Sequence, residues 1–291
     1  MTTPPAPADV QNNAATAQAQ AVLKGIVIPS CPAVLMDLRT EMAAEDPDLR
    51  KVARLVGADV ALSVAVLRTV NSPYFGLSRT VESIEQAVSL VGMRQIGLLV
   101  TSLLMRQSVQ GSGLNLVRFW DVSNKRSFAM LKLARGLKMG DADTAQSFGL
   151  FCDIGIPLLM QRFPDYGLTL KLANDAHDVP FTDVESGRHG ADHAQIGAMM
   201  ARSWGLSDTL CLAIRRHHDY TLFQDPKVPE AVTLLVAMSL VAELAIQRFA
   251  RLNASAEWNK GGEYAIGALM LSDQDLEDWV DTLMDGFSSG V

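Results

Sequence analysis

The chain has 291 residues, of which 48% are hydrophobic and only 6% aromatic, and its formal net charge is -7. This length and apolar content are enough to bury a sizeable core, which excludes a disordered or fibrous protein. An acidic surface repels a phosphate backbone unless basic residues gather in one patch, and the sequence shows no such patch. We therefore expect a globular protein that does not bind nucleic acid.

The cysteines and the N-terminus predict a soluble, cytoplasmic protein. Three cysteines lie far apart in the chain, at Cys31, Cys152 and Cys211. Their odd number and wide spacing indicate reduced thiols rather than a disulfide framework. Residues 1–22 lack a basic segment followed by an apolar one and predict a flexible tail. The longest apolar runs, 96–105 and 234–242, are shorter than the roughly 20 residues that a membrane span requires.

Apolar residues recur with a helical period along almost the whole first half. A helix is expected to start at Asp46-Pro47, and a second covers residues 58–72. A third begins at Ser83, continues to residue 105, and is apolar on most of its surface. A loop opens at residues 110–115. With no alternating strand and no internal repeat, the sequence predicts an all-α fold.

The second half begins with a helix at residues 118–138. Arg126 lies on the apolar face of this helix, an unusual place for a guanidinium. A helical stretch at 141–163 follows, and then a polar loop that contains residues 181–192. Further helices are expected at 193–206, 207–220, 229–252 and 272–284.

Residues 49–72 have the superficial spacing of a helix-turn-helix. The helix that would read DNA, at residues 60–66, is almost entirely apolar, and Arg68 alone could contact a base or phosphate well. Such a helix belongs in a core, so a DNA-binding regulator ranks third among the functions considered.

Several separated motifs nevertheless occur in one order along the chain. They are IPSCPAVLMDLRTE at 28–41, residues 46–100, RSFAMLKLAR at 126–135, FGLFCDIG at 148–155, DHAQIGAMMARSWGL at 192–206 and AIRRHHD at 213–219. Together they resemble the HDOD family, the HD-related output domain, over about residues 28–220. The resemblance implies two packed helical lobes, at 23–115 and 116–285, followed by a short tail at 286–291. The second lobe would be similar to HD-type metal-dependent phosphohydrolases.

The resemblance also implies a degenerate metal site. An HD-type site takes a first histidine from the helix that here contains Arg126, and a His-Asp pair where this chain has Cys152 and Asp153. Two imidazoles of such a site are therefore missing. The guanidinium of Arg126 cannot replace one of them, because it has no lone pair to donate and its positive charge repels a cation. The remaining candidates are Asp153, His193, His217, His218 and Asp219. We expect no bound metal or other cofactor.

Each candidate residue has an ordinary alternative role. Arg126 either forms an ion pair with Asp153 or extends to the surface. Cys152 is either a small buried hydrophobic residue or a zinc ligand beside Asp153 and His193. His193 could belong to a helix cap.

The other histidines are expected to be less important. His217 and His218 are more simply explained as a solvated helix end, stabilised by the helix dipole, than as metal ligands. His177 and His189 lie in the expected polar loop and have no evident partners.

The resemblance implies a non-catalytic module of bacterial signal transduction. Such a module would bind a protein partner or a small signalling ligand. A response regulator or a cyclic-dinucleotide enzyme acting in trans is the partner that the family suggests. A metal-dependent phosphohydrolase with a reduced ligand set remains the alternative.

Overall fold

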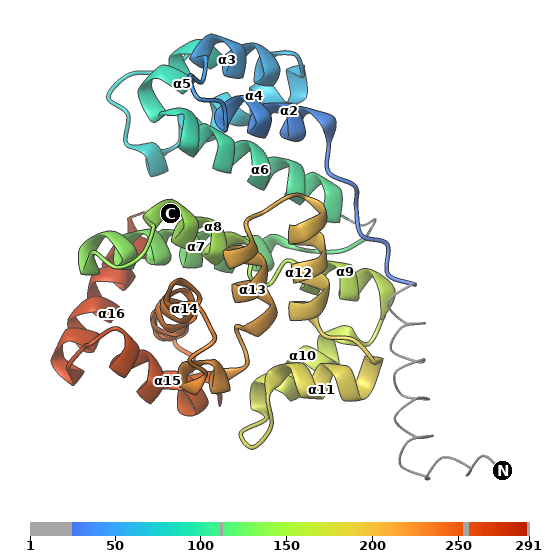
Figure 1. Ribbon diagram of the computed structural model, residues 1–291, viewed down its shortest axis with the longest axis vertical. Coiled ribbons are helices and arrows are strands. Elements are labelled where there is room, and N and C mark those ends of the chain that lie inside the picture. Colours follow the sequence, from blue (N-terminus) through green and yellow to red (C-terminus); the bar gives the residue numbers. More distant parts are fainter. Residues whose placement is uncertain (1–24, 111–112, 253–255, 290–291) are drawn as a thin grey trace.

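The computed structural model describes residues 25–110, 113–252 and 256–289. These residues form helices and contain no strand, so the predicted all-α fold is confirmed (Figure 1). The flexible tail expected at residues 1–22 lies outside the described residues.

The first lobe, in blue and blue-green in Figure 1, is a bundle of short helices. Its α-helices are α2 (Ala33–Met42), α3 (Leu49–Gly57), α4 (Val60–Val70), α5 (Ile84–Val91) and α6 (Met93–Val109), with a 3-10 turn at Pro73–Phe75. Carboxylates and hydroxyls begin these helices: Asp48, Asp59 and Ser83 each accept a hydrogen bond from a backbone N–H of the first turn of α3, α4 or α5. Leu62, Val66 and Val70 of α4 are buried, which agrees with a core helix rather than a DNA-reading one.

The single long helix expected from Ser83 is in fact two helices. Gly92 has a φ of +90°, a conformation that glycine adopts readily, and α5 and α6 meet there at 119°. The apolar pattern continues on both sides of the glycine, which explains why the break was not predicted. The bend lets α6 run beneath the other helices and face the second lobe (Figure 1).

The second lobe contains the remaining helices. They are α7 (Val117–Leu137), α8 (Ala142–Phe151), α9 (Gly155–Arg162), α10 (Tyr166–Asp175), α11 (Phe181–His189), α12 (His193–Ser203), α13 (Asp208–Arg216), α14 (Glu230–Phe249), α15 (Ala256–Ala268) and α16 (Asp273–Ser288), with a 3-10 helix at Tyr220–Gln224. Figure 1 shows α14 nearly end-on, with α7, α13, α15 and α16 around it.

Helix α14 confirms the helix expected at residues 229–252. Its length of 20 residues and the mean hydropathy of 1.6 in its most apolar window would suffice, by length and composition, to cross a membrane. However, 72% of its most apolar window is buried inside the protein. Its environment is therefore that of the central helix of a helical lobe.

Two expectations about local structure were wrong. The polar loop expected at residues 181–192 is largely helix α11, because Phe181, Glu185 and His189 recur every four residues and are all buried. The C-terminal tail expected from residue 286 is still helix α16 up to Ser288. Phe287 is buried and packs its ring edgewise against Phe128 and Phe249, which holds this last turn.

Candidate functional site

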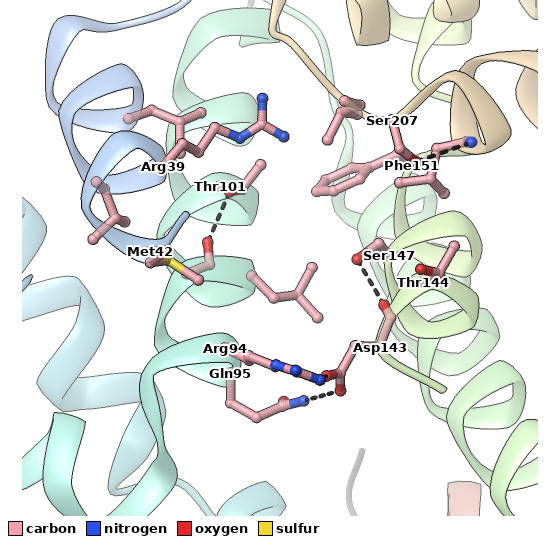
Figure 2. A pocket seen from close by; sticks show the side chains of 16 residues that line it. Arg39, Met42, Arg94, Gln95, Thr101, Asp143, Thr144, Ser147, Phe151 and Ser207 are labelled. Carbon is pink, nitrogen blue, oxygen red and sulfur yellow. Dashed lines mark hydrogen bonds and ion pairs between the residues drawn. The ribbon is translucent and has the colours of Figure 1, made fainter. Parts of the chain in front are cut away.

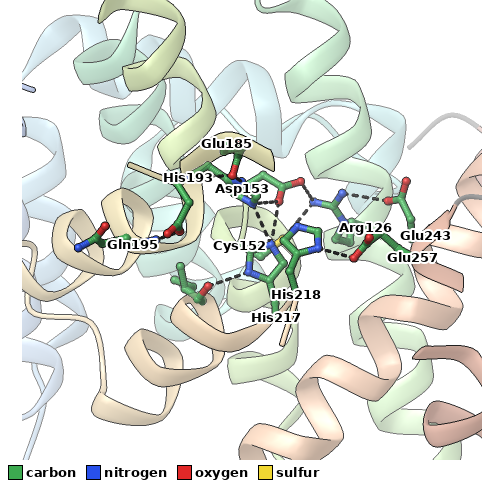
Figure 3. A network of polar contacts seen from close by, with 12 residues as sticks. Arg126, Cys152, Asp153, Glu185, His193, Gln195, His217, His218, Glu243 and Glu257 are labelled. Atoms are coloured by element: carbon green, nitrogen blue, oxygen red, sulfur yellow. Dashed lines mark hydrogen bonds and ion pairs between the residues drawn. The ribbon is translucent and has the colours of Figure 1, made fainter. Parts of the chain in front are cut away.

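A network of polar side chains lies inside the second lobe, where several segments of the chain converge (Figure 3). Arg126 comes from α7, Asp153 from the turn between α8 and α9, and His193 from the first turn of α12. His217 and His218 follow the last residue of α13. Arg126, His193 and His217 are buried, so the network is part of the interior of the protein.

A glycine brings two of these segments together. A Cβ atom on Gly155, the first residue of α9, would lie 2.1 Å from the carbonyl oxygen of His193. Only glycine therefore permits this contact between α9 and α12. On the other side of the contact, Asp192 caps α12 by accepting from the N–H of Gln195 at 2.7 Å. These two features place Asp153 beside His193. His193 is the first residue of α12, and the residue that caps this helix is Asp192.

The expected ion pair between Arg126 and Asp153 is present. Nη1 of Arg126 lies 2.7 Å from Oδ2 of Asp153, and Nη2 lies 3.0 Å from Oε2 of Glu243. Arg126 is only 7% exposed, so the alternative in which it extends to the surface is wrong. Burial alone would lower the pKa of Arg126, but the carboxylates of Asp153 and Glu243 keep it well above its ordinary value. The guanidinium is permanently charged.

Cys152 takes part in the same contact. Nη1 of Arg126 lies 3.0 Å from its Sγ atom, and the side chain is buried. Burial raises the pKa of the Cys152 thiol to about 12, against the opposing effect of Arg126. Cys152 is thus a buried neutral thiol, as in the simpler of the two roles considered for it.

The second oxygen of Asp153 faces the histidines. Oδ1 lies 3.2 Å from Nε2 of His217 and 3.5 Å from Nε2 of His193. Burial would raise the pKa of Asp153, but Arg126 and the two imidazoles hold it well below its usual range. Asp153 is therefore an ionised carboxylate with its two oxygens turned toward different partners.

Hydrogen bonds on the outer side of each ring determine which nitrogen faces inward. Nδ1 of His217 lies 2.7 Å from the carbonyl oxygen of Ile214, which can only accept, so this Nδ1 carries the hydrogen. Nδ1 of His193 donates to Oε2 of Glu185 at 2.7 Å. In the neutral rings the Nε2 lone pairs of both histidines consequently point toward Asp153.

The third histidine follows the same rule. Nδ1 of His218 donates to Oε2 of Glu257 at 2.6 Å, and the hydroxyl of Tyr220 donates to the same oxygen at 2.5 Å. Burial opposes ionisation of Glu257, but His218 and Lys260 lower its pKa to about 2. The ring of Phe181 stacks on His218, with centroids 4.7 Å apart. These contacts fix the orientation and the tautomer of His218, and its Nε2 is the nitrogen that could bind a cation.

The two inner histidines hold different numbers of protons when no cation is bound. Burial alone would lower both pKa values, but Glu185 and Asp153 raise the pKa of His193 to about 10. The pKa of His217 falls to about 4, because burial is joined by unfavourable electrostatic interactions with the neighbouring histidine rings. The proton on Nε2 of His193 is then donated to Nε2 of His217 across 3.1 Å.

Four side chains of the network could hold one cation. Asp153, His193, His217 and His218 each offer one ligand atom, and these atoms all lie within 4.8 Å of one another. Imidazole and carboxylate donors in this number suit a zinc-type ion. The expectation that His217 and His218 form a solvated helix end was wrong, since His217 is buried and both rings belong to the cluster.

Other sequence candidates lie elsewhere. Asp219 binds Arg216 at 2.8 Å and caps the following 3-10 helix. His189, expected to have no partner, is buried, contacts Oγ1 of Thr169 at 2.7 Å and stacks on Phe163. His177 is exposed.

Sequence reasoning missed the three carboxylates that orient the cluster, Glu185, Glu243 and Glu257. Glu185 lies on α11, which was taken for a loop. Glu243 had a visible signal, because it is an acidic residue in the middle of the apolar helix α14. Glu257 had no comparable signal in the sequence.

A separate cavity lies between the two lobes (Figure 2). Its volume is about 280 Å³, and α2 and α6 line it from one side while α8 and the start of α13 line it from the other. Apolar side chains such as Leu35 and Phe151 form much of the wall. Arg94 and Asp143 bridge the lobes with an ion pair of 3.2 Å, and Nη1 of Arg39 donates to the carbonyl of Trp204.

Solved structures of similar fold come from several bacteria. A protein from Shewanella amazonensis SB2B, provisionally described as a phosphohydrolase, is 24% identical, with a TM-score of 0.69 over 93% of this chain and 97% of that one. An HDOD domain protein of unknown function from Geobacter sulfurreducens is 20% identical, with a TM-score of 0.71 over 95% of both chains. A protein from Marinobacter aquaeolei VT8, provisionally described as a signal transduction protein, is 18% identical, with a TM-score of 0.71 over 95% of this chain and 64% of that one. These identities show a shared fold.

Comparison of sequences gives the family. An uncharacterized protein of Treponema pallidum (strain Nichols) is 26% identical over 223 residues, which are 76% of this chain. The aligned part spans only 42% of that relative. The family model of the HDOD domain matches residues 28–220, about two thirds of the chain. The chain belongs to the HDOD domain family.

Proposed function

We propose that the chain is a non-catalytic module of bacterial signal transduction, which acts in the cytoplasm by binding a protein partner or a small signalling ligand. One observation carries the proposal. The guanidinium of Arg126 lies against Asp153 and Glu243, at 2.7 and 3.0 Å, and it occupies the position at which the resemblance to HD-type sites implies a first imidazole.

The chemistry of metal-dependent hydrolysis explains why this arrangement favours binding over catalysis. Such an enzyme needs a cation with an open position, at which a water molecule becomes acidic enough to attack. A guanidinium keeps its charge but offers no lone pair and no exchangeable water. Four protein donors would in turn complete the shell of a tetrahedral ion and leave no position for water.

The size of the cavity between the lobes is consistent with a small signalling ligand. Its volume of about 280 Å³ is just below the roughly 300–1,000 Å³ typical of ligand sites, so it suits a molecule smaller than an intact cyclic dinucleotide. A partner from cyclic-dinucleotide signalling would therefore be a protein. We propose a response regulator or a cyclic-dinucleotide enzyme that acts in trans.

A hydrolysis assay tests the non-catalytic part of the proposal. The purified protein would be supplied in turn with Zn²⁺, Mn²⁺ and Fe²⁺ and incubated with bis-p-nitrophenyl phosphate and with cyclic dinucleotides. We expect the rate to equal that of the Asp153→Ala variant. Turnover that depends on the metal and is lost in Asp153→Ala would show an enzyme instead.

The partner is tested by cross-linking in the native cell, followed by biolayer interferometry with the purified candidates. We expect saturable binding to a response regulator or a cyclic-dinucleotide enzyme. Failure of all such proteins to bind the full chain would remove this part of the proposal.

The second candidate is a metal-dependent phosphohydrolase, and the cluster of Asp153 with three histidines favours it. These residues could hold a cation of more than four ligands, which would keep an open position. The hydrolysis assay separates the two candidates, because only the second predicts metal-dependent turnover.

A further inference from the structure

We propose that Asp153, His193, His217 and His218 form a site for one divalent cation of the zinc class, closed by these four side chains. The proposal goes beyond a binding function for the module, because it assigns a ligand to its interior. It would hold whether or not a signalling partner is found.

The first argument is the convergence of acceptor atoms. Nε2 of His193 lies 3.1 Å from Nε2 of His217, and each lies within 3.5 Å of Oδ1 of Asp153. When no cation is bound, the proton on Nε2 of His193 lies between these acceptors, and a divalent cation could take the place of that proton. A cation among these atoms would bind all of them at once.

The second argument is the set of hydrogen bonds around the cluster. Each of the three imidazoles donates through Nδ1 to an oxygen on its outer side, at 2.6 to 2.7 Å. Two of those oxygens are carboxylates, of Glu185 and Glu257, and one is the backbone carbonyl of Ile214. Metal-binding histidines have this arrangement, since the outer acceptor fixes the tautomer and makes the inner nitrogen a better donor.

The third argument is the balance of charge. Four carboxylates surround the cluster, those of Asp153, Glu185, Glu243 and Glu257. The fixed cations that contact them are Arg126 and Lys260. When the imidazoles are neutral, as metal ligands must be, two negative charges are left over, and one divalent cation would neutralise them.

The same geometry limits the site to one ion. Oδ2 of Asp153 and Oε2 of Glu243 are occupied by the two terminal nitrogens of Arg126. A second cation next to Asp153 would meet this permanent positive charge at close range. The Sγ atom of Cys152 faces the same guanidinium, so the ion would be bound through nitrogen and oxygen alone.

Metal titration of the purified full chain tests the proposal. The protein would be stripped with a chelator and titrated with Zn²⁺ against a competing indicator, and bound metal would be counted by mass spectrometry. We expect one equivalent per chain and a Tm that rises with Zn²⁺, because an ion that binds only the folded state stabilises it.

Substitutions locate the ion. His217→Gln and His218→Gln should each weaken Zn²⁺ binding at least about tenfold and reduce the rise in Tm. His189→Gln is the matched control, since His189 is also buried but lies outside the cluster. Affinity unchanged in both cluster variants, or lost equally in His189→Gln, would overturn the assignment.

X-ray absorption on the zinc-loaded wild-type protein keeps the test decisive if a variant does not fold. The expected spectrum contains three imidazoles and one carboxylate oxygen at about 2.0–2.2 Å, with no sulfur. A sulfur shell at about 2.3 Å, or failure of the wild-type protein to bind zinc, would contradict the proposal.

Discussion

Arg126 determines the chemistry of the buried network. Its guanidinium neutralises a carboxylate that would otherwise be costly to bury, and it contacts Cys152, Asp153 and Glu243 together. The charge cannot be removed by any accessible pH, because the pKa of Arg126 is held well above its ordinary value. The site therefore keeps one fixed positive charge next to the carboxylate of Asp153.

Replacing Arg126 by Met should lower the free energy of unfolding by about 3 kcal/mol, because it leaves the carboxylates of Asp153 and Glu243 without their main partner. Urea denaturation of the metal-free protein measures this. Arg94→Met is the control: Arg94 also pairs with an aspartate, Asp143, but its side chain is 78% exposed, and the cost should stay below about 1 kcal/mol. If the two substitutions lowered the free energy of unfolding equally, burial of the Arg126 ion pairs would not add to the stability of the protein.

The sequence predicted some residues of the site and not others. The position of Arg126 on an apolar helical face already indicated a buried guanidinium, and Asp153 was its natural partner. The burial of His217 could not be predicted, because its ring contacts Phe148, Asp153 and His193, which lie on segments remote in sequence. Helix ends are usually solvated, so the local pattern favoured the wrong interpretation.

At the scale of the elements, the close contact of α9 with α12 places the ligands. Gly155 allows the backbone of α9 to meet the backbone of His193, and Gly197 of α12 lies at the same contact. Neither helix would bring its polar residue to the cluster without this approach.

Gly155→Ala should destabilise the protein by at least about 2 kcal/mol, because the added Cβ would lie 2.1 Å from the carbonyl oxygen of His193 and must push the helices apart. The same substitution should weaken Zn²⁺ binding. Thermal unfolding and metal titration measure the two effects. The control is Gly187→Ala in α11, where a Cβ meets nothing within 4 Å and the helix should gain up to about 1 kcal/mol. A neutral Gly155→Ala would show that the helices can separate at no cost.

Helical period predicted most elements of the fold but failed at two places for physical reasons. In α11, two of the three residues on the buried face are Glu185 and His189, so the apolar period that marks a helix is hidden. At Gly92, apolar residues on both sides kept the period unbroken through a bend of 119°. The first error comes from tertiary contacts that bury polar side chains, and the second from the backbone conformation of a single glycine.

At the scale of the whole molecule, α14 is the centre of the second lobe, and it also carries Glu243 to the network. Its apolar side chains are buried by neighbouring helices, among them α7, α13, α15 and α16. The stability of the lobe, and so the geometry of the site, depends on this packing rather than on a lipid environment.

Leu244→Ala should cost about 2–5 kcal/mol in detergent-free buffer, because Leu244 is 2% exposed and its loss leaves a cavity. Leu168→Ala in α10 is the control. Its side chain is 53% exposed, and the change should be less than about 1 kcal/mol. A small effect at Leu244, or a protein that folds only in detergent, would argue against α14 as a core helix.

The most direct test of the whole account is a crystal structure of the zinc-loaded protein with anomalous diffraction at the zinc edge. The account predicts one peak per chain, enclosed by Nε2 of His193, His217 and His218 and by Oδ1 of Asp153, with Arg126 still bound to Oδ2. A second peak next to Asp153 at the position of the guanidinium, with Arg126 turned away, would contradict it.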